Sequence, residues 1–285
     1  MSQATLAPSS APPELATFLE EARVLVERDL ETRLAVTPGA DPGRLGEAMH
    51  YAATGPGKRL RPALVIAACE ACGGTREMAL PAASAIEMLH AYTLVHDDLP
   101  AMDNDDERRG RPTVHIAFGE AIAILAGDGL LTLAFGTLAE LGPQAAAAVG
   151  VLARRAGVEE LLAGQAIDLS AAGRVPGAVR ESLADLPAIE RLHAAKTGAL
   201  FAAAAELGAI AAGAAPETCA ALGRYGLAIG IAFQHADDRD DAELVEHAAA
   251  AAERMRVLCA KAAADVRPLS STILDGFATW IASRA

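Results

Sequence analysis

Runs of alanine recur along this chain, at residues 145–148, 202–205 and 248–252. Alanine has the highest intrinsic helix propensity. The β-branched and aromatic residues that favour strands are sparse, and aromatic residues make up only 4% of the chain. We therefore expect an all-α protein. At 285 residues the chain can bury a sizeable core. Because no internal repeat or linker interrupts it, we expect a single domain over residues 1–285.

Apolar residues recur at helical spacing through most of the chain, and proline and glycine mark the turns between these segments. We expect helices over residues 14–35, 45–53, 81–99, 114–126, 129–141, 144–171, 189–212, 217–240, 242–264 and 272–284. Residues 1–13 are small and polar and lack the basic and apolar regions of a signal peptide, so we expect a disordered lead there.

The net charge of −13 argues against nucleic acids and anionic membrane surfaces as partners. The most apolar stretches, residues 121–139 and 198–215, are interrupted by Asp128 and Glu206. We expect them to be buried core helices and not membrane spans. Four cysteines in a chain of this length fit a reducing cytoplasm, so we expect a cytoplasmic protein.

Two groups of aspartates stand far apart in this apolar chain. The first is Asp97, Asp98 and Asp103, and the second is Asp237, Asp238, Asp240 and Asp241. Carboxylates repel one another, so a cation must offset each group. Oxygen ligands without a cluster of histidine or cysteine suit Mg²⁺, which binds one or two carboxylates together with substrate phosphates. Two such groups facing one cavity would hold a diphosphate between them through metal ions.

Helical spacing places Asp237 and Asp241 on one face, with Gln234 on the same stripe. A solvated acidic helix end is the alternative reading of this second group. In the first group, Asp103 falls off the stripe of Asp97, but Pro100 breaks the helix and lets the chain loop the third carboxylate back.

Cationic residues accompany both groups of aspartates. His90 precedes Asp97 by two helical turns, and Arg108 and Arg109 follow the first group at loop distance. Lys58 and Arg61 form another set, and Lys196 lies in a third. Arginine recognises phosphate in a planar, bidentate manner and lysine acts as a point charge. Two of the only three lysines thus fall beside glycine-containing turns in apolar surroundings.

Six motifs carry a resemblance to a known family. In order, they are Gly57-Lys58-Arg59-Leu60-Arg61-Pro62, the segment from Leu89 through His96-Asp97-Asp98 to Asp103, Arg108-Arg109-Gly110, Gly164-Gln165-Ala166-Ile167-Asp168, Lys196-Thr197-Gly198 and Phe233-Gln234-His235-Ala236-Asp237-Asp238. From about residue 15 to 241 the chain resembles a trans-isoprenyl diphosphate synthase of the bacterial farnesyl and geranylgeranyl type. The resemblance implies a helical bundle of the isoprenoid synthase type with a central active-site cavity.

The resemblance also implies the roles of the site residues. Asp97, Asp98 and Asp103 would hold Mg²⁺ against an allylic diphosphate, and Asp237 and Asp241 would hold a further Mg²⁺ from the opposite wall, with up to three ions in all. Arg108 and Lys196 would contact the same diphosphate. Lys58, Arg61, His90 and Arg109 would bind isopentenyl diphosphate, while Thr197 and Gln234 would line the reacting centre. A homodimer is implied as well.

The chemistry implied is ionisation of the allylic diphosphate, condensation with isopentenyl diphosphate and loss of a proton. Tyr92 lies five residues before Asp97, with Thr93 next to it, and the resemblance implies that such a bulky ring forms the floor of the product pocket. We therefore expect a short-chain product, with farnesyl diphosphate favoured over its ten- and twenty-carbon counterparts.

The chain departs from the family pattern after the second aspartate group. Residues 242–260 contain no lysine, and Arg239 and Asp240 replace a typical apolar pair. Two alternatives to an active synthase therefore stay open. One is a non-catalytic or regulatory subunit of a heteromeric prenyl synthase. The other is a class I terpene cyclase, although a cyclase would not need Lys58, Arg61 and His90.

Overall fold

The computed structural model describes residues 10–37, 39–240 and 247–285, and these residues are almost entirely helical, as the composition predicted. The main helices are α1 (Pro13–Arg33), α2 (Leu45–Ala53), α3 (Leu60–Ala71), α4 (Arg76–Asp97), α5 (Val114–Phe118), α6 (Glu120–Leu138), α7 (Ala145–Arg155), α8 (Leu161–Ala171), α9 (Leu186–His193), α10 (Ala199–Ala211), α11 (Pro216–Asp240), α12 (Ala248–Val266) and α13 (Thr272–Ala282). A short hairpin of β1 (Glu107–Arg108) and β2 (Arg111–Pro112) pairs Arg108 with Arg111.

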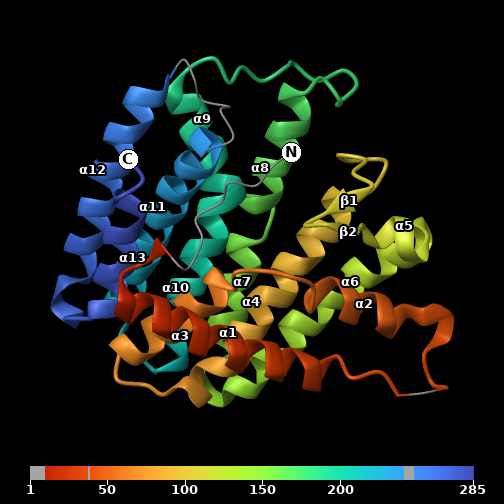
Figure 1. The fold of residues 1–285 in the computed structure, drawn as a ribbon, viewed down its shortest axis with the longest axis horizontal. Coiled ribbons are helices and arrows are strands. Elements are labelled where there is room, and N and C mark those ends of the chain that lie inside the picture. The colour runs from red at the N-terminus through yellow and green to blue at the C-terminus, as the bar shows by residue number, and fades with distance from the viewer. Residues whose placement is uncertain (1–9, 38, 241–246) are drawn as a thin grey trace.

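Helix α10 forms the centre of the bundle (Figure 1), and every one of its residues is buried. It packs against α3, α4, α7 and α11. Gly208 permits the approach to α3, because a Cβ there would lie 2.2 Å from the carbonyl oxygen of Val65. The close packing fixes α4 and α11, the two helices whose C-terminal ends carry the aspartate groups.

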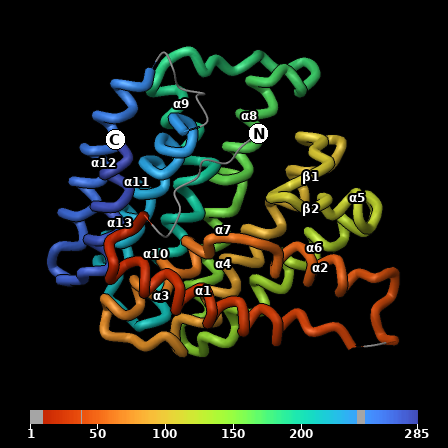
Figure 2. Tube along the Cα trace, viewed as in Figure 1, coloured from red at the N-terminus to blue at the C-terminus, as the bar shows by residue number. Residues whose placement is uncertain are grey.

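The two ends of the described chain meet beside this bundle. Figure 2 shows α1 and α13 side by side, and the indole nitrogen of Trp280 donates a hydrogen bond of 3.0 Å to Ser10 Oγ. One hydrophobic core includes residues from α1 through α13.

Several predicted boundaries were wrong. The helix expected over residues 144–171 is two helices, α7 and α8, separated by a turn that contains Gly157. Helix α4 begins at Arg76, five residues earlier than expected, because Thr75 caps it by accepting a hydrogen bond from the Met78 N–H. Residues 1–9 of the expected lead and residues 242–246 of the expected helix lie outside the described residues.

Among the residues that the structure describes, three helical segments are long enough and apolar enough to cross a membrane, by length and composition only. They are Arg76–Asp97, Glu120–Arg155 and Leu186–Ala211. The share of the most apolar part of each segment that is buried inside the protein is 67%, 39% and 83%, in that order. The expectation of a buried core helix therefore holds for α10. It holds only in part for α6, where Ile124 and Leu125 remain 45% and 50% exposed.

Candidate active site

The first aspartate group lies where α4 ends. The helix stops at Asp97, and the chain turns at Pro100, which has no N–H to continue the helical hydrogen bonds. The Asp103 N–H then donates a hydrogen bond of 2.8 Å back to the carbonyl oxygen of Asp97. The backbone thus returns Asp103 to the end of α4, as the proline position predicted.

The charge on Asp97 is costly in the free protein. Burial raises the pKa of Asp97 to about 6, and the nearby charge of Asp103 adds to the rise, while Lys196 opposes it. A group of carboxylates in this state favours a bound cation. Its oxygen donors fit Mg²⁺. Among residues 10–37, 39–240 and 247–285 no three His, Cys, Asp or Glu side chains are grouped so that they could hold a metal ion by themselves.

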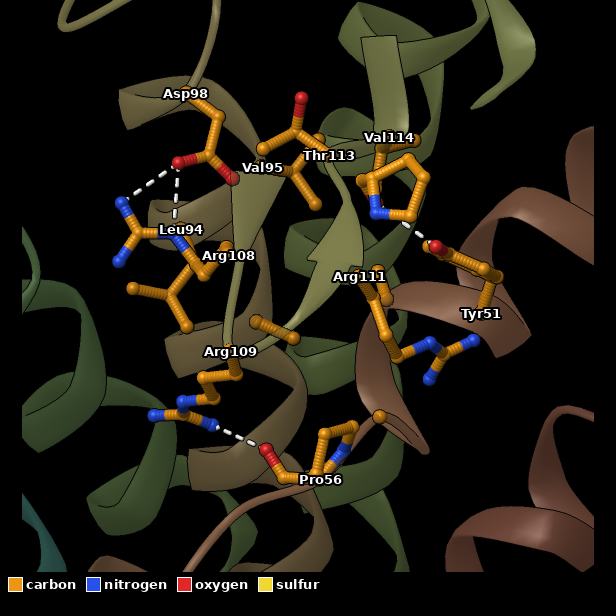
Figure 3. A pocket seen from close by; sticks show the side chains of 14 residues that line it. Tyr51, Pro56, Leu94, Val95, Asp98, Arg108, Arg109, Arg111, Thr113 and Val114 are labelled. Atoms are coloured by element: carbon orange, nitrogen blue, oxygen red, sulfur yellow. Dashed lines mark hydrogen bonds and ion pairs between the residues drawn. The ribbon is translucent and has the colours of Figure 1, made fainter. Parts of the chain in front are cut away.

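Asp98 forms an ion pair with Arg108 (Figure 3). The Arg108 Nη2 and Nε atoms lie 2.6 Å and 2.7 Å from Asp98 Oδ1. Arg108 is placed by the β1–β2 hairpin. The sequence grouped Asp98 with the metal ligands and Arg108 with the diphosphate, whereas here each side chain neutralises the other.

The cationic side chains of Lys58, Arg61 and Arg109 lie beside this pair together with His90, the four residues that the sequence grouped. They line a cavity of about 470 Å³ that Asp237 and Gln234 also line. The Arg61 Nη1 atom lies 3.3 Å from His90 Nε2. Burial, and then the charge of Arg61, holds the pKa of His90 well below its usual value, so the ring is neutral and accepts this hydrogen bond.

Burial also disfavours the charged forms of two members of this group. It lowers the pKa of Arg61 to about 10 and lowers the pKa of Lys58. Within the described chain, the Lys58 Nζ atom is buried and has no hydrogen-bond partner. Unpaired buried charge is unfavourable unless an anion neutralises it. This cavity is therefore built to receive an anionic group such as a diphosphate.

A buried ion pair that sequence reasoning missed supports this cationic cavity. Arg59 Nη1 lies 2.6 Å from Glu87 Oε1 of α4, and its Nη2 atom donates to the carbonyl oxygen of Gly55 at 2.6 Å. Arg109 Nη1 donates to the carbonyl oxygen of Pro56 at 2.8 Å (Figure 3). The two arginines thus hold the loop that presents Lys58.

The second aspartate group lies at the C-terminal end of α11, which packs against a short π-helix, Ala194–Gly198. Thr197 Oγ1 donates to Gln234 Oε1 at 2.8 Å, and Gln234 Nε2 donates to Asp238 Oδ1 at 2.7 Å. His193 Nε2 lies 2.9 Å from the other oxygen of Asp238. Gln234 therefore pairs with Asp238, to which the sequence analysis assigned no individual role. Asp241, the other expected metal ligand of this group, lies outside the described residues.

Lys196 and the second aspartate group have further partners that the sequence did not predict. Lys196 Nζ forms an ion pair with Asp168 of α8, a member of a motif that had received no role. Arg239 Nη1 donates to the carbonyl oxygen of Arg284 at 2.6 Å, and Arg284 forms an ion pair with Asp240. Arg239 and Asp240, the two residues that depart from the family pattern, therefore both bind Arg284, which follows α13.

A second, more apolar cavity of about 500 Å³ adjoins the cationic one. Asp97 and Lys196 line it, together with Tyr92, Thr93, Leu99, Met102, Ile124, Leu161 and Leu200. Arg61, His90 and Leu94 line both cavities. The two cavities are therefore neighbours, with Asp97 on the wall of the apolar cavity and Asp237 on the wall of the cationic cavity.

Comparisons with known proteins agree with this geometry. A family model described as Polyprenyl synthetase matches residues 42–249. The large subunit 1 of a heterodimeric geranylgeranyl pyrophosphate synthase of Arabidopsis thaliana is 44% identical over 221 residues, which cover 75% of this chain and 57% of the plant protein. The farnesyl diphosphate synthase of Geobacillus stearothermophilus is 40% identical over 235 residues, which cover 80% of this chain and 76% of that protein.

Among solved structures, an FPP/GFPP synthase from Zymomonas mobilis is similar to this chain with a TM-score of 0.85 and 39% sequence identity. That match covers 94% of this chain and 99% of the Zymomonas chain. The chain spans a little more than half the length of the Arabidopsis relative.

Proposed function

The chain belongs to the polyprenyl synthetase family, and from that membership we propose that it is a short-chain trans-prenyltransferase that condenses isopentenyl diphosphate with an allylic diphosphate. The observation that carries the proposal is a pair of neighbouring cavities that share Arg61, His90 and Leu94. Lys58 and Asp237 line the cationic cavity, and Asp97 lines the apolar one. Together they would combine two diphosphate sites with room for a hydrocarbon chain.

The residues that line these two cavities suit the proposed reaction. Cleavage of the allylic C–O bond leaves a carbocation and a diphosphate that carries more negative charge. Arg108 and Lys196 would bind this diphosphate and stabilise that charge, which favours the transition state. The cationic group would hold isopentenyl diphosphate with its double bond facing the carbocation. The double bond would attack the allylic carbocation and form the new C–C bond. The departing diphosphate would then accept a proton from the carbocation that results, which leaves a new double bond, and the apolar walls would keep water out.

The proposal includes magnesium dependence. The carboxylates of Asp97, Asp103 and Asp237 offer the oxygen ligands that Mg²⁺ prefers, and we assign up to three ions to them together with the substrate diphosphate. Asp98 and Asp241 remain candidate ligands from the sequence. Bound Mg²⁺ would neutralise part of the charge on the leaving diphosphate.

We further assign a fifteen-carbon product, farnesyl diphosphate. Tyr92 is only 7% exposed and lines the apolar cavity, which supports its role as a floor that ends the hydrocarbon chain. The substitution Tyr92→Ala should lengthen the product. An unchanged product length in that variant would contradict this assignment.

A homodimer in the cytoplasm is also part of the proposal. Helix α6 is apolar around most of its circumference, and its Leu125 side chain is 50% exposed. A second copy of the chain covering this face would remove that apolar surface from water.

The decisive experiment incubates the purified protein with Mg²⁺, isopentenyl diphosphate and, in turn, dimethylallyl, geranyl and farnesyl diphosphate. Liquid chromatography with mass spectrometry should detect an elongated diphosphate whose formation stops when EDTA removes the metal. A hydrocarbon product would instead indicate a terpene cyclase. No reaction with any of the three substrates would indicate a regulatory subunit, and either outcome overturns the proposal.

A further inference from the structure

The apolar cavity has a second aromatic ring on its wall, contributed by His96. His96 follows Tyr92 by one helical turn, so both side chains project from the same face of α4 toward α6. The two rings meet edge to face, with centroids 5.5 Å apart and an interplanar angle of 89°. Both side chains line the cavity that Asp97 opens into.

The His96 ring is held in place from α6. Its Nε2 atom lies 3.1 Å from the carbonyl oxygen of Ile124, and a ring nitrogen must carry the hydrogen to bond a carbonyl oxygen. The ring lies against Gly127, where a Cβ would approach Nε2 to 2.1 Å. Glycine at this position therefore creates the space that the ring occupies, and the Ile124 carbonyl fixes its orientation.

We propose that His96 is a second determinant of product length, because it fills the gap between α4 and α6 and keeps the Tyr92 ring across the cavity. Without the imidazole, the space above Gly127 joins the cavity and the Tyr92 ring can swing into it. The floor of the cavity is thus a pair of rings supported by a glycine, and not one tyrosine. This inference rests on the proposed prenyltransferase function.

The proposal predicts that substitutions of His96 and of Gly127 change the product length in opposite directions. His96→Ala removes one ring while Tyr92 stays, so the main product should become at least one isoprene unit longer. Gly127→Ala leaves both rings in the chain but drives the imidazole off α6 and toward the cavity, so the product should become shorter. The two substitutions act from different helices, and each tests the inference if the other variant fails to fold.

The experiment measures the distribution of product lengths for the parent, His96→Ala, Gly127→Ala and a control, His50→Ala. His50 lies on α2, is 34% exposed and pairs with Glu31 at 2.6 Å, so its removal should leave the product unchanged. Melting temperatures establish that each variant is folded. Tyr92→Phe keeps the ring and should keep the parent product.

The outcomes separate this inference from the function on which it rests. A parent protein that forms no elongated diphosphate contradicts the proposed function. A parent that elongates, with a folded His96→Ala or Gly127→Ala variant that yields the parent distribution, overturns the role of His96. A longer product from His96→Ala, with His50→Ala unchanged, supports it.

Discussion

Arg108 Nη2 lies 2.6 Å from Asp98 Oδ1, so a side chain expected to bind diphosphate and one expected to bind metal form an ion pair with each other. Burial raises the pKa of Asp98, while the hydrogen bond from Arg108 opposes that rise. When a diphosphate and its cations arrive, each side chain can exchange its partner for the ligand of opposite charge. The pair therefore keeps both groups charged and in position before substrate binds.

We expect Arg108→Gln to weaken use of the allylic substrate. A charge-assisted hydrogen bond contributes about 1.5–3 kcal/mol, so kcat/KM for the allylic diphosphate should fall by about 10- to 100-fold. Steady-state kinetics with isopentenyl diphosphate at saturation would measure the change. Arg256→Gln on α12, where the exposed arginine pairs with Glu253, is the control. Equal kinetic constants for the parent and Arg108→Gln would show that Arg108 does not contact the diphosphate.

Lys58→Met should weaken the binding of isopentenyl diphosphate without destabilising the fold. The ammonium group is buried without a hydrogen-bond partner in the described residues, so its removal relieves an unfavourable charge and the melting temperature should stay the same or rise. The KM for isopentenyl diphosphate should rise by about 10-fold or more, because one charged contact is lost. The KM for the allylic substrate should change little.

The matched control for this lysine is Lys261→Met on α12, where the side chain is exposed. Both KM values should remain those of the parent. A Lys58→Met protein that melts at a much lower temperature would indicate that the attraction of the ammonium group to Asp237 outweighs the cost of its burial.

His90 should make the stability of the protein depend on pH. Burial and the charges of Arg61, Arg109, Arg59 and Arg108 hold the pKa of His90 well below 6.5 in the folded chain. Below about pH 6.5 the unfolded chain therefore binds a proton that the folded chain does not, and stability falls by up to about 1.4 kcal/mol per pH unit. Above that pH the contribution is fully present.

Urea unfolding at a series of pH values measures this dependence. The slope between about pH 6.5 and pH 5 should be smaller for His90→Gln than for the parent, because the variant has no proton to take up at this position. Identical slopes would mean that His90 is protonated as readily in the folded chain as in the unfolded one.

Leu125→Glu should disrupt the proposed homodimer. Leu125 is 50% exposed on α6, and a carboxylate there could not be buried against a second copy. Light scattering after size-exclusion chromatography should report a dimer for the parent and a monomer for the variant. Val179→Glu is the control, since Val179 is 91% exposed in the loop between α8 and α9. A parent protein with the mass of one chain would contradict the dimer.

Much of the fold and of the site could be predicted because the information is local. Alanine-rich segments with helical spacing predicted the bundle, and Pro100 predicted that Asp103 returns to Asp97. The ordered motifs also predicted that Lys58, His90 and Asp237 meet at one hollow.

Contacts between distant residues could not be predicted in this way. Arg59 and Glu87 are 28 residues apart, and Arg239 and Arg284 are 45 apart, so no spacing rule joins them. The π-helical turn before Ala199 was also missed, because it depends on packing between α8 and α11 and not on local propensity.

The central claim is that both aspartate groups bind one allylic diphosphate through Mg²⁺ ions. Isothermal titration calorimetry with a non-cleavable thio analogue of geranyl diphosphate tests it without relying on turnover. With Mg²⁺ present we expect one site per chain, and either Asp97→Asn or Asp237→Asn should weaken binding about 10-fold or more, as for loss of a charged ligand. An affinity that Asp237→Asn leaves unchanged, or binding that is equally tight without Mg²⁺, would contradict the account.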